Sequence, residues 1–124
     1  MRIVGHPIVR EPDGLALSSR NAYLSAQERA QALGIVRGLS SAFHAFEAGE
    51  RQQKSLVDAA AAELAKHGLA PQYVSVVDAD TLEPFGNRPV TDRALLAVAA
   101  LCGRTRLIDN VVFGEDPDPL QANA

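Results

Sequence analysis

The part of the sequence best suited to chemistry is a run of polar side chains that ends in Ser18, Ser19, Arg20 and Asn21. These residues stand directly ahead of a predicted helix, and free backbone N–H groups at a helix start attract anions. An arginine side chain adds a planar fork of donors that matches phosphate oxygens. The pattern therefore indicates a phosphate-binding loop without a metal ligand. The alternative is structural: the serines and Asn21 cap the chain, and Arg20 pairs with a surface carboxylate.

Other catalytic signatures are absent from the sequence. It contains no Walker-type phosphate loop and no Gly-x-Gly-x-x-Gly, His-Glu-x-x-His or Gly-x-Ser-x-Gly pattern. The three histidines, His6, His44 and His67, share no metal-ligand spacing. We expect His44 to be a packed or surface side chain and His67 to be a favourable charge near a helix C-terminus. The single Cys102 excludes an internal disulfide, and its apolar neighbours favour a core residue over a nucleophile.

Composition places the chain among ordinary globular proteins. It has 124 residues, enough for one domain, with 47% hydrophobic and 22% charged residues. The net charge of −3 gives no general attraction to nucleic acid or anionic lipid, so neither is expected as a partner. The start of the sequence does not resemble a signal peptide, and no apolar stretch is long enough to cross a bilayer. The expected location is the cytoplasm.

Two helices are predicted in the first half of the chain. Ser25 and Glu28 have the spacing of a capping box, and Gly49 stands where a helix of this phase would end. Between them, apolar residues recur at helical spacing: Ala32, Ile35, Val36, Leu39, Phe43 and Phe46. A second helix is predicted for residues 52–66. The short link between the two predicts a helical hairpin.

Three strands are predicted in the second half, at residues 72–77, 94–101 and 107–113. The expected fold is therefore α+β, with the helical hairpin packed on a small, mainly antiparallel three-stranded sheet. Residues 114–124 contain two Asp-Pro pairs and no apolar period, so we expect a domain at 1–113 followed by a flexible tail.

A longer pattern narrows the interpretation. Residues 5–24 closely resemble the segment that opens the C-terminal domain of the pantoate–β-alanine ligases, through the string Asp13-Gly14-Leu15-Ala16-Leu17-Ser18-Ser19-Arg20-Asn21. Two later runs resemble further motifs of that family in the same order: Asp78-Ala79-Asp80-Thr81-Leu82 and Arg104-Thr105-Arg106-Leu107-Ile108-Asp109-Asn110. The resemblance covers the chain except for its tail.

The resemblance implies an ATP-dependent reaction in two steps. The carboxylate of pantoate attacks the α-phosphate of ATP to give pantoyl adenylate and pyrophosphate, and the amine of β-alanine then displaces AMP. By this resemblance Ser18, Ser19 and Arg20 would hold the β- and γ-phosphates, with Ser19 and Arg20 as the catalytic pair. The backbone of Val9 would bind the adenine. Mg²⁺ would be held mainly by the phosphates and not by this domain.

The family's N-terminal domain is a Rossmann-like fold with a His-x-Gly-His motif, which is absent here. The resemblance therefore implies the smaller, lid-like half of a ligase, inactive without its N-terminal partner domain. The alternative is a non-catalytic interaction module that retains the fold. The intact Ser18-Ser19-Arg20 triplet favours the ligase, because a purely structural module has no need of it.

Overall fold

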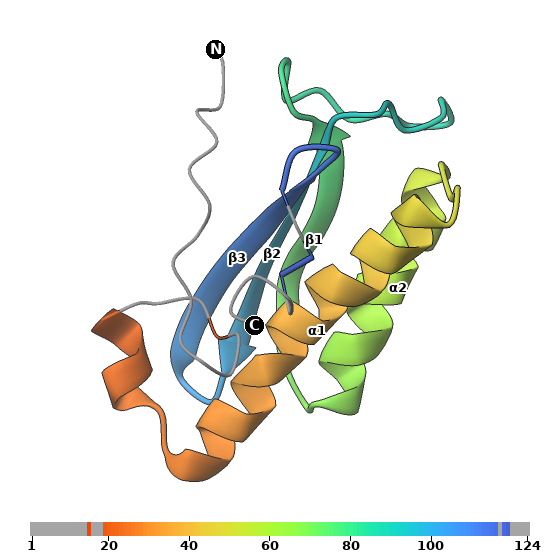
Figure 1. The fold of residues 1–124 in the computed structure, drawn as a ribbon. Helices are drawn as coiled ribbons and strands as arrows, with labels where there is room; N and C mark the ends of the chain where they lie inside the picture. The colour runs from red at the N-terminus through yellow and green to blue at the C-terminus, as the bar shows by residue number, and fades with distance from the viewer. Residues whose placement is uncertain (1–14, 16–18, 117, 120–124) are drawn as a thin grey trace.

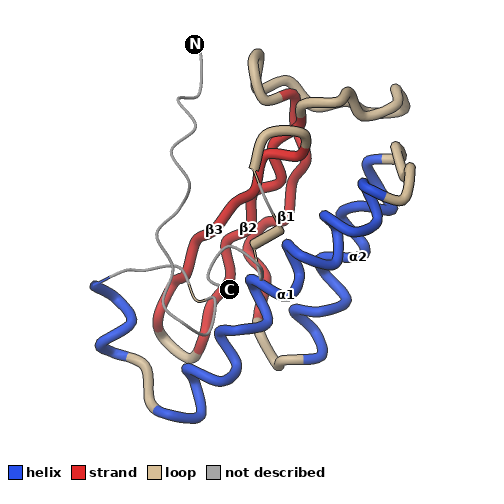
Figure 2. Tube along the Cα trace, in the orientation of Figure 1, coloured by secondary structure: helices blue, strands red, loops and turns tan. Residues whose placement is uncertain are grey.

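The fold has two layers, a helical hairpin on one face of a three-stranded sheet (Figures 1 and 2). The computed structural model describes Leu15, residues 19–116, Asp118 and Pro119; at Ser19 and Arg20 it describes the backbone alone. This arrangement confirms the predicted α+β class. Within that described part, no helix is both long and apolar enough to span a membrane.

Helix α1, Ala26–Glu47, begins where the sequence predicts. The Ser25 side chain accepts a hydrogen bond from the Glu28 N–H (3.1 Å), and the Glu28 carboxylate accepts one from the Ser25 N–H (3.0 Å). Both bonds of the capping box are therefore made, so two N–H groups without helical partners are satisfied. The helix ends before Gly49, whose φ of 106° favours glycine.

Helix α2, Gln53–Lys66, packs against α1. Its start has no side-chain cap, because Gln52 occupies the N-cap position without such a hydrogen bond. Its end is better defined. The ring Nδ1 of His67 lies 2.8 Å from the Glu63 carbonyl oxygen, and Gly68 follows with a φ of 72°. His67 thus interacts with a carbonyl at the helix C-terminus, where it was predicted.

The sheet is fully antiparallel, in the order β1-β2-β3, with strands Ala70–Asp78, Ala94–Cys102 and Thr105–Phe113. All three predicted strands are confirmed, but β1 and β3 each start two residues earlier than predicted. Ala70, Pro71 and Gln72 are exposed, and the pairing register shifts between Pro71 and Tyr73. Exposed residues at an irregular strand start do not alternate between apolar and polar types. The sequence pattern therefore could not predict the first residues of β1.

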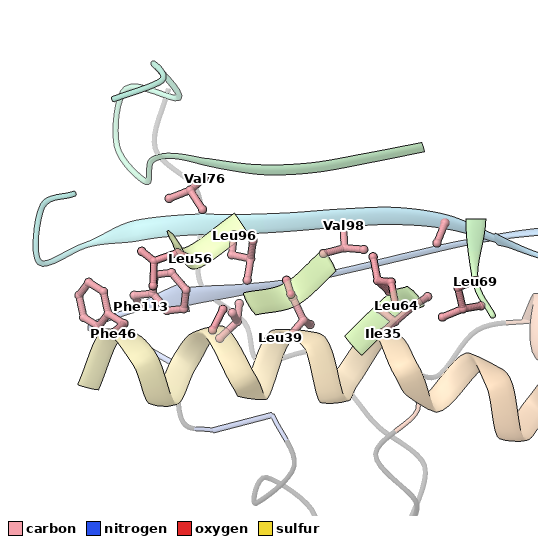
Figure 3. Close-up of a cluster of buried hydrophobic side chains, with 14 of the residues drawn as sticks. Ile35, Leu39, Phe46, Leu56, Leu64, Leu69, Val76, Leu96, Val98 and Phe113 are labelled. Carbon is pink, nitrogen blue, oxygen red and sulfur yellow. The ribbon is translucent and has the colours of Figure 1, made fainter. Parts of the chain in front are cut away.

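The core fills the space between the two layers (Figure 3). Leu39 of α1, Leu56 and Leu64 of α2 and Leu96 of β2 are all 0% exposed. At one end, the rings of Phe46 and Phe113 stack with centroids 4.7 Å apart. Cys102 is also fully buried, which confirms it as a core residue.

The segment after β3 differs from the expected flexible tail. Asp118 and Pro119 are buried, and Asp118 makes contacts with α1. These two residues therefore belong to the packed structure, because the carboxylate of Asp118 finds donors there. The predicted boundary at residue 113 stays a prediction, and residues 117 and 120–124 lie outside the described part.

Candidate functional site

The predicted phosphate loop leads into a short 3-10 helix, η1, at Ser19–Tyr23. Two leucines near η1 belong to the core: Leu15 is 4% exposed, and Leu24, which follows η1, packs against the same core. Leu24 N–H also donates to the Asn21 carbonyl (3.2 Å), and η1 lies against β3. The C-terminal end of η1 is therefore tied to the packed structure.

The structure brings only part of the predicted site into view. Val9 and Ser18 lie outside the described residues, and so do the side chains of Ser19 and Arg20. Their predicted roles remain predictions. The structure adds the position of η1, which precedes α1 and contacts the edge strand β3.

The β2–β3 turn supports the start of α1. The Cys102 thiol donates to the Glu28 carbonyl (3.1 Å), and a side chain at Gly103 would collide with the Glu28 carboxylate. Burial, followed by the nearby Glu28 carboxylate, raises the pKa of the Cys102 thiol. Cys102 therefore stays protonated and acts as a packing residue, not a nucleophile. The sequence predicted a turn at Gly103, but it gave no sign of the contact with Glu28.

The run 78–82, which resembles a family motif, forms a turn around one carboxylate. Asp78 Oδ1 accepts hydrogen bonds from the N–H groups of Asp80 (2.8 Å) and Thr81 (3.0 Å). These bonds lower the pKa of Asp78, since they favour its charged form. The motif thus has a structural role in ending β1.

Asp78→Asn should cost stability in a pH-dependent way. Because the folded pKa is lowered, the stabilising effect is complete above the unfolded pKa and is lost as the pH falls through the folded pKa. Thermal melts of variant and wild type should differ at neutral pH and converge at about pH 2. An equal gap at both pH values would show that the charge of Asp78 is not the source of the effect.

The run 104–110 also has structural contacts. Asp109 is 2% exposed and accepts a hydrogen bond from the Asn110 N–H (2.8 Å). Exposed Arg106 donates from Nε to the Gln72 side chain (2.6 Å), which links β3 to β1 across the outer face of the sheet. Among the residues with described positions, no group of three or more His, Cys, Asp or Glu side chains could hold a metal ion.

Solved structures share this two-layer fold. The crystal structure of pantothenate synthetase from Thermus thermophilus superimposes with a TM-score of 0.78 at 35% sequence identity, over 87% of this chain and 38% of that one. The fold and the Asp-Gly-Leu-Ala-Leu-Ser-Ser-Arg-Asn string are thus both similar to those of the pantothenate synthetase class.

The family follows from the sequence comparison. The family model described as pantoate-beta-alanine ligase matches residues 1–112, so the chain belongs to the pantoate–β-alanine ligase family. It is 51% identical to the pantothenate synthetase of Myxococcus xanthus over 112 residues, 90% of this chain. It is 54% identical to the bifunctional pantoate ligase/cytidylate kinase of Synechococcus elongatus, also over 112 residues.

The chain is much shorter than these relatives. It spans 38% of the Myxococcus xanthus protein and 21% of the Synechococcus elongatus protein. The matched region is therefore one part of each relative, and the activity of the whole relatives does not transfer to this chain without further argument.

Proposed function

We propose that the chain is the ATP-side lid domain of a ligase that condenses pantoate with β-alanine through a pantoyl adenylate. The observation that carries the proposal is the intact Ser18-Ser19-Arg20 triplet in a chain that belongs to this family. Such a run of hydroxyl and guanidinium donors suits a phosphate-binding loop, since nucleotidyl transfer depends mainly on positioning and charge stabilisation.

Each loop residue has a role in the proposed reaction. When the pantoate carboxylate attacks the α-phosphate, negative charge develops on the departing pyrophosphate. Arg20 would neutralise that charge with its planar donor fork, and the Ser18 and Ser19 hydroxyls would donate to phosphate oxygens. The backbone of Val9 would hold the adenine. Any Mg²⁺ would be held mainly by the nucleotide phosphates and not by this domain.

The outer face of the sheet supports the need for a partner domain. Both described helices pack on the other face of the sheet (Figure 2). The strand residues that alternate with the core residues, and so point to the outer face, are largely apolar. One cross-strand row consists of Tyr73, Ala99 and Ile108, of which Tyr73 is 40% and Ile108 46% exposed. An open apolar sheet face is typical of a surface that another domain covers. In the proposed enzyme this would be the N-terminal Rossmann-like domain, with the pantoate pocket and the His-x-Gly-His motif.

The chain alone should make no pantothenate. It has no His-x-Gly-His motif, and one side of a two-sided cleft gives ATP few contacts, so isolated binding should also be weak. The test compares the purified chain with a chimera in which it replaces the 112 aligned residues of the Myxococcus xanthus synthetase. The chimera should release pyrophosphate only with both ATP and pantoate, and it should release AMP only when β-alanine is added as well.

Two results would contradict the proposal. Product formation by the isolated chain would show that it holds a complete site. If the chimera folded but was inactive while the parent Myxococcus xanthus enzyme was active in the same assay, the result would favour the alternative, a non-catalytic interaction module that retains the fold.

A further inference from the structure

Three polar side chains meet on α1 away from the phosphate loop. The Ser40 hydroxyl donates to Asp118 Oδ1 (2.7 Å), and His44 Nε2 lies 2.7 Å from Asp118 Oδ2. Ser40 and His44 are four residues apart, so they share one face of α1. Each oxygen of the carboxylate thus has its own donor.

Two of the three side chains in this contact are buried. Asp118 is 4% exposed and Ser40 3%, whereas the His44 side chain is 62% exposed. A buried carboxylate is costly unless it is paired and hydrogen-bonded. The site therefore offers a carboxylate a buried hydroxyl on one side and an imidazole on the rim.

The turn after β3 directs the chain into this site. Gly114 has a φ of 85°, and a side chain there would collide with the Asp92 carbonyl. Asp116 Oδ2 accepts a hydrogen bond from the Val112 N–H (2.8 Å), and Arg93 donates to Glu115 (3.0 Å). These contacts set the course of the chain as it leaves the sheet.

The sequence on either side of Asp118 favours the same arrangement. Asp118 lies between Pro117 and Pro119, and a residue before proline is biased towards extended backbone. Proline also reduces the freedom of the unfolded chain, so less entropy is lost when Asp118 is placed.

We propose that Ser40 and His44 form a carboxylate-binding site on α1, which Asp118 of the same chain occupies as the end of a strap from β3. The site recognises the carboxylate group itself, so a small free carboxylate binds when Asp118 is absent. Asp118 lies beyond residues 1–112, which the family model matches, whereas Ser40 and His44 lie within them. The test below measures thermal stability and not ligase activity, so its result does not depend on the proposed ligase reaction.

The test is thermal unfolding of the whole chain with sodium acetate or, at equal ionic strength, sodium chloride. Asp118→Ala should lower the melting temperature by about 5 °C, the loss expected for one or two buried hydrogen bonds. Acetate should recover part of this loss and chloride should not. Wild type should respond equally to both salts, and Asp58→Ala, which removes an exposed carboxylate from α2, should melt like wild type.

Second-site variants separate recognition from a general salt effect. Adding Ser40→Ala or His44→Gln to Asp118→Ala should abolish the difference between acetate and chloride. The proposal is overturned if Asp118→Ala melts like wild type, if the two salts act equally on it, or if acetate still acts without Ser40 and His44.

A milder pair of variants covers the case in which Asp118→Ala does not fold. Asp118→Asn keeps one acceptor and places an amide donor against the other partner. Its effect on the melting temperature should be non-additive with that of His44→Gln, because the two side chains are in contact. Simple additivity would show that the contact does not hold the strap and would overturn the proposal.

Discussion

Arg20→Ala in the Myxococcus chimera is expected to slow pyrophosphate release at saturating pantoate by about a hundredfold. The reason is the loss of one preorganised, charge-assisted donor at the point where negative charge develops, which costs on the order of 3 kcal/mol in the transition state. Folding should change little, because Arg20 lies in a short 3-10 turn outside α1, α2 and the sheet. A substitution of this kind usually shifts stability by within about 0.5 kcal/mol.

Two further variants test the nature of that donor. Arg20→Lys should recover only part of the rate, because an ammonium group keeps the charge but lacks the bidentate fork. Ser19→Ala should be milder than Arg20→Ala, since it removes a neutral donor. Wild type should therefore be fastest and Arg20→Ala slowest, with Ser19→Ala and Arg20→Lys between them.

The matched control is Arg37→Ala, which removes an exposed arginine from α1. It should leave both the rate and the melting temperature unchanged. If Arg20→Ala instead lowered the melting temperature while the rate per folded molecule stayed the same, Arg20 would be a structural residue that pairs with a carboxylate. The phosphate-binding assignment would then be wrong.

Features coded by neighbouring residues were predictable from the sequence. The capping box of α1 depends on Ser25 and Glu28, three positions apart, and the structure makes both of its bonds. The stop at Gly49 and the three strands follow from equally local patterns. The candidate loop was predicted for a different reason, because its nine-residue string resembles a family motif and not because its residue types alone decide between a phosphate loop and a cap.

Features that join distant residues were not predictable in this way. Asp118 lies 78 positions from Ser40 in the sequence. The Asp-Pro pairs around it predicted a flexible tail. Nothing near Asp118 in the sequence shows that α1 presents donors at the right place. The contact between Gly103 and the Glu28 carboxylate is a second example, because it joins the β2–β3 turn to α1, whereas the positive φ of Gly103 belongs to the turn itself. In each case the missing information was the packing of one element on another.

The close approach of the two helices is another such feature, and it depends on Gly34 and Gly38 of α1. A side-chain carbon at Gly38 would lie 2.9 Å from the Ala60 carbonyl oxygen, and one at Gly34 would lie 2.6 Å from His67 Cβ. The Ala60 carbonyl is part of the α2 backbone, so it cannot move aside as the end of a side chain can. The two glycines therefore let α1 and α2 approach closely.

Replacing both glycines with alanine should destabilise the chain, against the usual preference of helices for alanine. The helix gains about 0.5–1 kcal/mol at each site from propensity, whereas overpacking costs about 1–3 kcal/mol at each. The net expectation for the pair is a loss of about 2–3 kcal/mol, the middle of a range of about 0–5 kcal/mol, measured by urea unfolding. Arg37→Ala, on the exposed side of the same helix, should change stability by less than about 0.5 kcal/mol. A double variant more stable than wild type would show that the helices separate easily and that their packing does not require glycine at these two positions.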